Sequence, residues 1–405
     1  MKTSGVVAVL FAVPFLALPG SAVEPDRGAA ADPCATPTIV GTDKPDRLNG
    51  TAGPDIIDGA GGSDRIWGQG GDDILCGGGG ADLLRGGTGD DQLYGEQDRE
   101  FADTEDGAYY EGDTLAGGPG NDLLNVGDDP RTTDVEDVLD FSRAARGVTV
   151  DLPAQTATGE GSDLIVGPVG AVHGSEHADH VIGTALGEEI KTRSGADTVE
   201  SGAGNDWINL GPSKGGDSGG NVLDAGPGND YVTAGGRGDR LAGGDGNDSI
   251  SGGQARELLG GPGRDWIGVE LARGIPQVID GGEGPDELAL SVPHEWRGTH
   301  LVLSGRLDLA AGTTRFRSEG GSVRVITRGF ENADLLATGR WSVVGTAGPN
   351  LLYVDSSRGA VLIGRAGDDE LNGTTYGDLL RGGAGRDVAW GRGGPDRYAS
   401  VEKRL

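Results

Sequence analysis

Aromatic residues and cations are scarce in this sequence. Aromatics make up 5% of the 405 residues, and 33 Lys and Arg stand against 64 Asp and Glu, which gives a net charge of -31. So little apolar surface and so much like charge predict disorder, unless something neutralises the carboxylates. A divalent cation is the simplest candidate. Nucleic acid and anionic membranes carry the same sign of charge, so we expect neither as a partner.

Long apolar runs are missing beyond the N-terminus. Residues 6–18 are nearly all apolar, follow Lys2 and precede the small residues 20–22, which predicts a secretory signal peptide over residues 1–22. The run is short for a membrane span, although an uncleaved anchor is the alternative. We expect no later segment to cross a bilayer, and we predict a secreted, extracellular protein.

Cysteine is nearly absent as well, with Cys34 and Cys76 as the two residues. In an oxidising compartment they could form a disulfide, and two free thiols are the alternative. Closing a loop of about 40 residues would stabilise the fold by roughly 3–4 kcal/mol in the chain-entropy description.

Glycine, by contrast, is abundant, with 80 residues, and it precedes acids in a repeating phrase. The first acids follow one another at a strict nine-residue interval, each with an apolar residue two positions later. They are Asp46, Asp55, Asp64, Asp73, Asp82 and Asp91. Such self-similarity predicts a tandem-repeat architecture. The G-x-G-x-x-G strings belong to this repeat and lack the strand–helix context of a nucleotide site.

The same spacing returns along the rest of the chain. It includes Asp113 and Asp122, then a second block of Asp179, Glu188, Asp197, Asp206, Asn221, Asp230, Asp239, Asp248 and Glu257, with Asp265 and Asp286 less regular, and a third block of Asn350, Asp369, Asp378, Asp387 and Asp396.

The repeat has a direct physical interpretation. An acid followed by alternating polar and apolar residues predicts a very short strand with its apolar side chain pointing inward. The residues between strands form a turn in which glycine permits positive φ and close backbone approach. Such turns direct carbonyl oxygens to a common point, which the Asp carboxylate joins. A ligand set made only of oxygen favours calcium over zinc or copper.

These residues resemble the RTX, or hemolysin-type, calcium-binding nonapeptide Gly-Gly-x-Gly-x-Asp-x-apolar-x. Residues 117–125 and 243–251 match it fully. The resemblance implies an all-β fold, a right-handed parallel β-roll (β-solenoid), in which two nonapeptides make one turn and calcium lies between turns along each edge. With Cys34 before the first repeat and Cys76 within it, the N-terminal block is also similar to secreted actinobacterial repeat proteins.

On this resemblance, the expected Ca2+ ligands are the repeat aspartates. They are Asp46, Asp55, Asp64, Asp73, Asp82, Asp91, Asp113, Asp122, Asp197, Asp206, Asp230, Asp239, Asp248, Asp286, Asp369, Asp378, Asp387 and Asp396.

Some repeats depart from the pattern. The departures are Glu188 and Glu257 in place of Asp, Asn221 and Asn350 without the charge, and His177, Leu186 and Tyr376 in place of the fourth-position glycine. We expect these turns to bind calcium weakly or not at all, and the first block and residues 364–399 to bind best.

Three segments break the spacing. Residues 96–111 are acidic and predict a solvated loop, whereas apolar alternation at Val148, Val150 and Leu152, and again over 300–303 and 322–327, predicts strands. We therefore expect β-rich caps or spacers between three roll blocks. The predicted organisation is 1–22 signal peptide, 23–40 linker or cap, 41–125 first block, 126–173 insertion, 174–289 second block, 290–344 insertion, 345–399 third block and 400–405 tail.

Several other motifs have a less demanding explanation. Gly-Asp-Ser-Gly-Gly at 216–220 copies a serine-protease phrase, but no suitable base accompanies it. A transition-metal site at His173, His177 and His180 needs helical spacing, and exposed loop histidines are the alternative. The Arg-Gly-Asp tripeptide at 237–239 falls on the repeat's own register. The six tryptophans predict packing on the roll or a sugar-binding strip.

We therefore predict a non-catalytic, calcium-binding repeat protein with a structural or surface-associated role, which folds on binding calcium. A carbohydrate- or cell-wall-binding module with a cell-surface glycan as partner is one alternative. A secreted hydrolase or toxin with a repeat folding tail is another, although the longest non-repeat segment, of about 55 residues, leaves little room for a catalytic domain.

Overall fold

A computed structural model describes residues 32–96, 112–127, 137–211, 220–270, 277–291, 295–296, 299–300, 302–318 and 321–404. The predicted signal peptide, the acidic loop beyond Glu96 and most of the Gly-Asp-Ser-Gly-Gly phrase lie outside these residues. The described residues contain strands and turns, and among them no helix is long and apolar enough to span a membrane.

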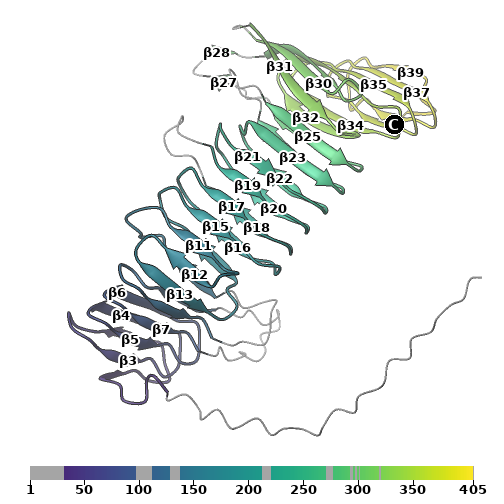
Figure 1. The fold of residues 1–405 in the computed structure, drawn as a ribbon. Coiled ribbons are helices and arrows are strands. Elements are labelled where there is room, and N and C mark those ends of the chain that lie inside the picture. The colour runs from purple at the N-terminus through teal and green to yellow at the C-terminus, as the bar shows by residue number, and fades with distance from the viewer. Residues whose placement is uncertain are drawn as a thin grey trace, which may run out of the picture.

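Two long sheets run side by side along an elongated molecule, from β3–β7 at one end to β35, β37 and β39 at the other (Figure 1). The order of the first sheet is β1 (Ile39–Val40), β3 (Ile56–Asp58), β5 (Ile74–Cys76), β7 (Gln92–Tyr94), β9 (Leu123–Asn125), β13 (Ser162–Val166), β12 (Thr156–Thr158), β11 (Thr149–Asp151), β15 (His180–Ile182), β17 (Thr198–Glu200), β19 (Val222–Asp224), β21 (Arg240–Ala242), β23 (Glu257–Pro262), β25 (Val278–Glu283), β31 (Gly321–Arg328), β30 (Thr313–Ser318), β29 (Val302–Asp308), β33 (Arg340–Val344), β35 (Val361–Ala366), β37 (Leu379–Ala384) and β39 (Arg397–Ala399).

The second sheet is parallel throughout. Its order is β2 (Arg47–Asn49), β4 (Arg65–Gly70), β6 (Leu83–Thr88), β8 (Thr114–Ala116), β10 (Val138–Asp140), β14 (Ala171–His173), β16 (Glu189–Lys191), β18 (Trp207–Asn209), β20 (Tyr231–Thr233), β22 (Ser249–Ser251), β24 (Trp266–Glu270), β26 (Glu287–Ser291), β32 (Asn332–Ala337), β34 (Leu351–Ser356), β36 (Glu370–Asn372), β38 (Val388–Trp390) and β40 (Lys403–Arg404). A separate hairpin joins β27 (Glu295–Trp296) to β28 (Thr299–His300).

The register confirms that two nonapeptides make one turn of a β-roll. In the first sheet Ile57 lies opposite Leu75, and Leu75 opposite Leu93, each pair 18 residues apart. All three side chains are fully buried, because the middle residue of each short strand points between the sheets. Burial of one such side chain contributes about 1.5–3 kcal/mol, so a column of them forms the core despite the low apolar content.

The segment 126–173 extends the roll rather than separating two blocks. Strands β10 and β14 continue the second sheet, and β11, β12 and β13 form an antiparallel meander inside the first sheet. The strand predicted around Val150 is confirmed, and Leu139, Val150 and Ile165 continue the buried column. The expected spacer is therefore part of the stacked core.

The segment 290–344 is integrated in the same way. Strands β29, β30 and β31 form antiparallel hairpins between β25 and β33, while β32 pairs with β26 and β34 in the second sheet. The strand predicted over 322–327 lies within β31. Phe330 and Trp341, both at 1% exposure, belong to the core at this level of the roll.

A disulfide joins Cys34 to Cys76 and ties the N-terminal segment to the end of β5. The Cα atoms lie 6.5 Å apart, and the bridge closes a loop across 42 residues. The double variant Cys34→Ser, Cys76→Ser should lose up to about 4 kcal/mol of unfolding free energy, because the unfolded chain gains freedom. Denaturant titration in calcium measures this loss, and an unchanged midpoint would contradict it.

Candidate calcium sites

The repeat acids lie directly before the strands, in two rows along the two edges of the roll. One oxygen of each carboxylate, Oδ1, accepts the backbone N–H of the acid one turn earlier. The amide of Asp55 donates to Asp73 Oδ1 at 2.8 Å, and the amide of Asp73 donates to Asp91 Oδ1 at 2.8 Å. We call such a series an acid ladder. It uses half of each carboxylate to hold successive turns in register.

The other oxygen, Oδ2, points into the turn and is buried. Among the described residues, many of these atoms have no hydrogen-bond partner within the protein. They include Oδ2 of Asp64, Asp73, Asp82, Asp91, Asp122, Asp230, Asp248, Asp265, Asp286, Asp369 and Asp387. A buried carboxylate oxygen without a donor is costly, and a whole row of them fits the binding of cations.

Backbone carbonyls of the following turn face these oxygens. The space beside the Gly68 Cα, which a Cβ would fill, adjoins both Asp73 Oδ2 and the Gly86 carbonyl oxygen. The same arrangement recurs at Gly260, where Asp265 Oδ2 meets the Gly281 carbonyl. Oxygen acceptors from two successive turns thus converge, which is the chemistry that a calcium ion requires.

The nitrogen and sulfur ligands of a transition-metal site do not gather in the described part of the chain. No three His, Cys, Asp or Glu side chains there form a cluster that could hold a metal ion by themselves. His173 lies in the second sheet near Glu189, and His180 lies in the first sheet near Glu200. The histidine-site alternative is therefore unsupported, and any metal site on the edges must combine carboxylates with backbone oxygens.

Burial raises the pKa of many ladder carboxyl groups, and repulsion from neighbouring acids adds to the rise at Asp82, Asp91 and Asp122. Desolvation brings the pKa of Asp82, Asp91 and Asp122 to about 7. Further along the roll the pKa of Asp230 and Asp265 also rises to about 7 from the same cause. Without a cation, the folded roll therefore favours protonated acids near neutral pH.

Five of the expected ligands differ from the rest, because a protein donor already serves their Oδ2 or because they end a ladder. Thr42, Thr51 and Thr374 donate backbone N–H bonds to Asp46, Asp55 and Asp378 at 2.6–2.7 Å. Gly236 does the same for Asp239 at 2.8 Å. Asp396 is the last acid on its edge. The remaining expected ligands lie on the edges as predicted by their spacing.

The ladder also contains six acids outside the expected ligand set, although Asp179 and Asp265 belong to the second repeat block. They are Asp137, Asp163, Asp179, Asp265, Glu331 and Glu402, each of which accepts an amide from the turn before it. Insertions displace most of them from the nine-residue interval. A shorter signal, an acid followed two residues later by a buried apolar residue, would have found Asp137 through Leu139.

Glu257 does not occupy the acid position that the spacing assigned to it. It is the first residue of β23 and lies opposite Arg240, with 3.5 Å between the Arg240 Nε and Glu257 Oε2 atoms. Arg256 stands at the acid position of that turn, because this turn is one residue shorter than the repeat. In the Arg-Gly-Asp tripeptide at 237–239, the Asp239 side chain is fully buried, so a partner protein cannot contact it.

Sequence comparison matches the chain to the RTX calcium-binding nonapeptide repeat (4 copies), over residues 40–75, 77–110, 108–129, 182–212, 215–236, 233–256 and 363–398. These segments fall in all three repeat blocks and coincide with the acid ladders. A comparison with curated proteins finds no match. Family, fold and edge geometry agree: the chain belongs to the RTX calcium-binding nonapeptide-repeat proteins.

Proposed function

We propose that this chain is a secreted, non-catalytic protein whose β-roll folds when calcium binds, and that the folded rod has a structural or surface-associated role. The observation that carries the proposal is the row of buried Oδ2 atoms facing carbonyl oxygens without a donor between them. Secretion is supported by Lys2 and the apolar run over residues 6–18, which together have the pattern of a signal peptide.

Calcium would be held where two turns meet. The proposed ligands are carboxylates of Asp64, Asp73, Asp82, Asp91, Asp113, Asp122, Asp197, Asp206, Asp230, Asp248, Asp265, Asp286, Asp369 and Asp387, each with backbone carbonyls of an adjacent turn. A bound cation supplies the positive charge that offsets repulsion between these carboxylates. Because the ligands come together only in the stacked roll, binding free energy becomes folding free energy.

Equilibrium dialysis against radioactive calcium, with excess magnesium present, tests the binding step. We expect several ions per chain with dissociation constants on the order of 10⁻⁴–10⁻³ M, as is typical of extracellular modules. Magnesium should compete poorly, since it demands a stricter octahedral geometry and dehydrates reluctantly. Absence of bound calcium at millimolar concentration would remove the proposed function.

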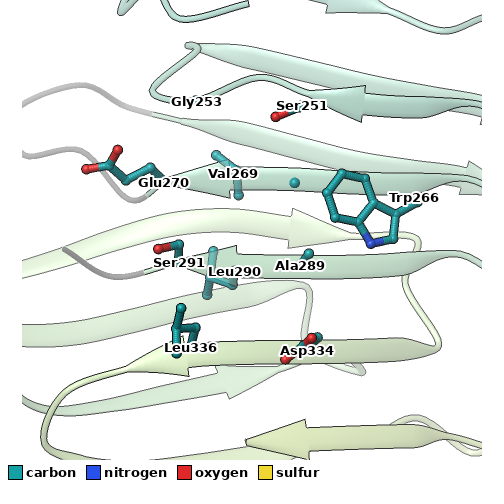
Figure 2. A pocket seen from close by; sticks show the side chains of 11 residues that line it. Ser251, Gly253, Trp266, Val269, Glu270, Ala289, Leu290, Ser291, Asp334 and Leu336 are labelled. Atoms are coloured by element: carbon teal, nitrogen blue, oxygen red, sulfur yellow. The ribbon is translucent and has the colours of Figure 1, made fainter. Parts of the chain in front are cut away.

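A pocket on the outer face of the second sheet favours a second candidate function, the binding of a neutral glycan. Its volume is about 380 Å³, and it spans β22, β24, β26 and β32 (Figure 2). Trp266, at 39% exposure, and Leu336, at 55% exposure, supply apolar walls. The Trp266 indole extends over Gly268, where any side chain would collide with the ring.

Polar groups complete this pocket. The carboxylates of Glu270 and Asp334 and the hydroxyls of Ser251 and Ser291 line it. An indole face packs against the C–H groups of a sugar ring, while carboxylates accept hydrogen bonds from its hydroxyls. Two carboxylates on a chain of net charge -31 would repel an anionic sugar, so the candidate ligand is neutral.

Calorimetric titration of the calcium-loaded chain with neutral glucose and N-acetylglucosamine oligosaccharides tests this second function. Trp266→Ala should weaken binding about tenfold, equivalent to roughly 1.4 kcal/mol of lost stacking. Trp207→Ala is the matched control, because Trp207 has the same 39% exposure on the same sheet but does not line the pocket. Equal binding by the two variants, or none by the parent chain, would eliminate the glycan site.

A further inference from the structure

Six turns close on themselves through a threonine or serine four residues before the acid. In one of them the Thr374 N–H donates to Asp378 Oδ2 at 2.7 Å, and its hydroxyl donates to Oδ1 at 2.9 Å. Ser175 makes the same two bonds to Asp179, both at 2.7 Å. We call these capped turns. Their Thr or Ser residues are Thr42, Thr51, Ser175, Thr184, Thr346 and Thr374.

The other described turns of the ladders have a different backbone, and we call them open turns. In most of them the residue four before the acid has positive φ, as at Gly87 (119°) and Gly244 (108°), whereas Gly235 before Asp239 does not. Even non-glycine residues adopt this conformation at that position, as at Gln69 (79°) and Arg365 (92°). In a capped turn the Thr or Ser has no positive φ, so its N–H and hydroxyl face the carboxylate instead.

Capping also removes the need for the fourth-position glycine. In most open turns that residue has positive φ, as at Gly89 (129°) and Gly246 (139°). In capped turns it has no positive φ, and the Thr or Ser hydroxyl accepts its N–H, at 3.0 Å for both His177 and Tyr376. His177, Leu186 and Tyr376, which replace the fourth-position glycine of the repeat, therefore lie in capped turns that do not need this glycine.

The positions of the capped turns follow a rule. Each one lies at the start of an acid ladder, and no described turn inside a ladder is capped. On the first edge the ladders begin at Asp55, Asp179 and Asp378, and on the second edge at Asp46, Glu188 and Asn350. The residues that precede these starts on the same edge either lack a carboxylate, as Val148 and Ala360 do, or end the previous ladder, as Glu331 does.

We infer that the six capped turns are metal-free starting turns, in which a protein hydroxyl and amide take the place of a calcium ion. The inference rests on the proposed calcium function and refines it. An inner turn also stacks on an earlier turn of its own ladder, whose carbonyl oxygens adjoin it, as the Gln69 oxygen adjoins Gly87 and the Gly71 oxygen adjoins Gly89. The first turn of a ladder faces a carbonyl of the following turn, as Asp55 faces Gly68, but has no earlier turn of its ladder to add oxygens. Its Thr or Ser supplies donors to the carboxylate instead.

The chain's own substitutions agree with this role. Asn350 and Glu188 replace Asp in capped turns. A turn that holds no metal needs neither the negative charge that Asn350 lacks nor the shorter side chain that Glu188 lacks. The Asn350 Nδ2 group donates to the Glu331 carbonyl at 2.6 Å and to Thr346 Oγ1 at 3.0 Å. The Asn350 N–H donor thus lies between its own carboxamide and the Glu331 carbonyl. The partial positive charge of this donor would repel a cation there.

Counting bound calcium by native mass spectrometry on full-length variants tests the inference. Asp387→Asn removes the acid of an open turn and should lower the number of ions bound. Asp378→Asn removes the acid of a capped turn in the same part of the roll and should leave that number unchanged. Both side chains are at least 97% buried, so the two variants are matched in environment.

A second pair of variants keeps the test valid if an Asp→Asn variant fails to fold. Thr374→Val removes the capping hydroxyl and should raise the calcium concentration needed for folding several-fold without changing the number of ions bound. Thr375→Val, at the exposed neighbouring position, should change neither quantity. If Asp378→Asn loses as many ions as Asp387→Asn, the capped turns are metal sites and the inference fails while the calcium function stands. If the parent chain binds no calcium, the calcium function itself fails.

Discussion

Gly86→Ala should abolish the calcium site at Asp91 and cost about 3 kcal/mol of folding free energy in calcium. The Gly86 φ is compatible with alanine, so the effect does not come from backbone strain. It comes from space, because the added Cβ would overlap the Asp91 carboxylate at Oδ2, Cγ and Cβ. The methyl group would occupy the volume beside the oxygen that we assign to calcium.

Gly53→Ala provides the control for this result. Gly53 lies in a capped turn, has no positive φ, and a Cβ there would meet no atom within 4 Å. We expect this variant to be neutral or slightly stabilising, by about 0.4–1 kcal/mol through the unfolded state. Thermal unfolding in calcium compares the two variants. Similar melting temperatures for Gly86→Ala and Gly53→Ala would show that the space beside Asp91 is not a functional cavity.

In chelator, acidification from about pH 8 to pH 5 should increase the β-sheet content of the chain. Asp82, Asp91 and Asp122 have a pKa of about 7 when folded, against 3.8 for an ordinary Asp. A group whose pKa is raised by folding binds its proton more tightly in the folded state. Protonation therefore stabilises the metal-free roll, fully below about pH 4, and the contribution is lost as the pH rises through about 7.

The same carboxyl groups should make calcium binding weaker in acid, because calcium and protons compete for them. The calcium affinity of the folded roll is expected to fall as the pH falls from 8 to 6. The calcium concentration at the folding midpoint should not rise over this range, because the protons that displace calcium also stabilise the folded state. Equilibrium dialysis measures the affinity, and circular dichroism at several pH values, with and without calcium, measures the folding midpoint. If metal-free β structure instead increased with pH, burial of the ladder acids would not be the dominant force on their protonation.

Much of this architecture can be predicted from local sequence, because each repeat is a complete structural unit. The nine-residue interval between Asp73 and Asp82 places one acid on each edge, and the apolar residue two positions later gives the core. Neighbouring turns contact mainly one another, so the fold follows from the repeat without knowledge of distant contacts. The resemblance to the RTX repeat then supplied the roll and its register.

Other features depend on information that spacing does not contain. The antiparallel meander over β11–β13 enters the sheet without repeat acids at each turn, so the segment looked like a spacer. Glu257 follows Asp248 at the nine-residue interval but does not stand at the acid position, because the turn before β23 is one residue shorter than the repeat. Each capped turn begins with a Gly-Thr or Gly-Ser pair in the sequence. The role of that pair depends on which way the Thr51 or Thr374 amide points, and this is a property of the folded backbone.

A calcium titration of the chain from residue 23 onward, followed by far-UV circular dichroism, tests the central claim most directly. We predict a coil spectrum in chelator at pH 8 and a cooperative transition to β structure on the order of 10⁻⁴–10⁻³ M calcium. The transition should reverse with chelator and should not occur with magnesium at the same concentration. A full β spectrum in chelator at pH 8, unchanged by calcium, would contradict calcium-coupled folding.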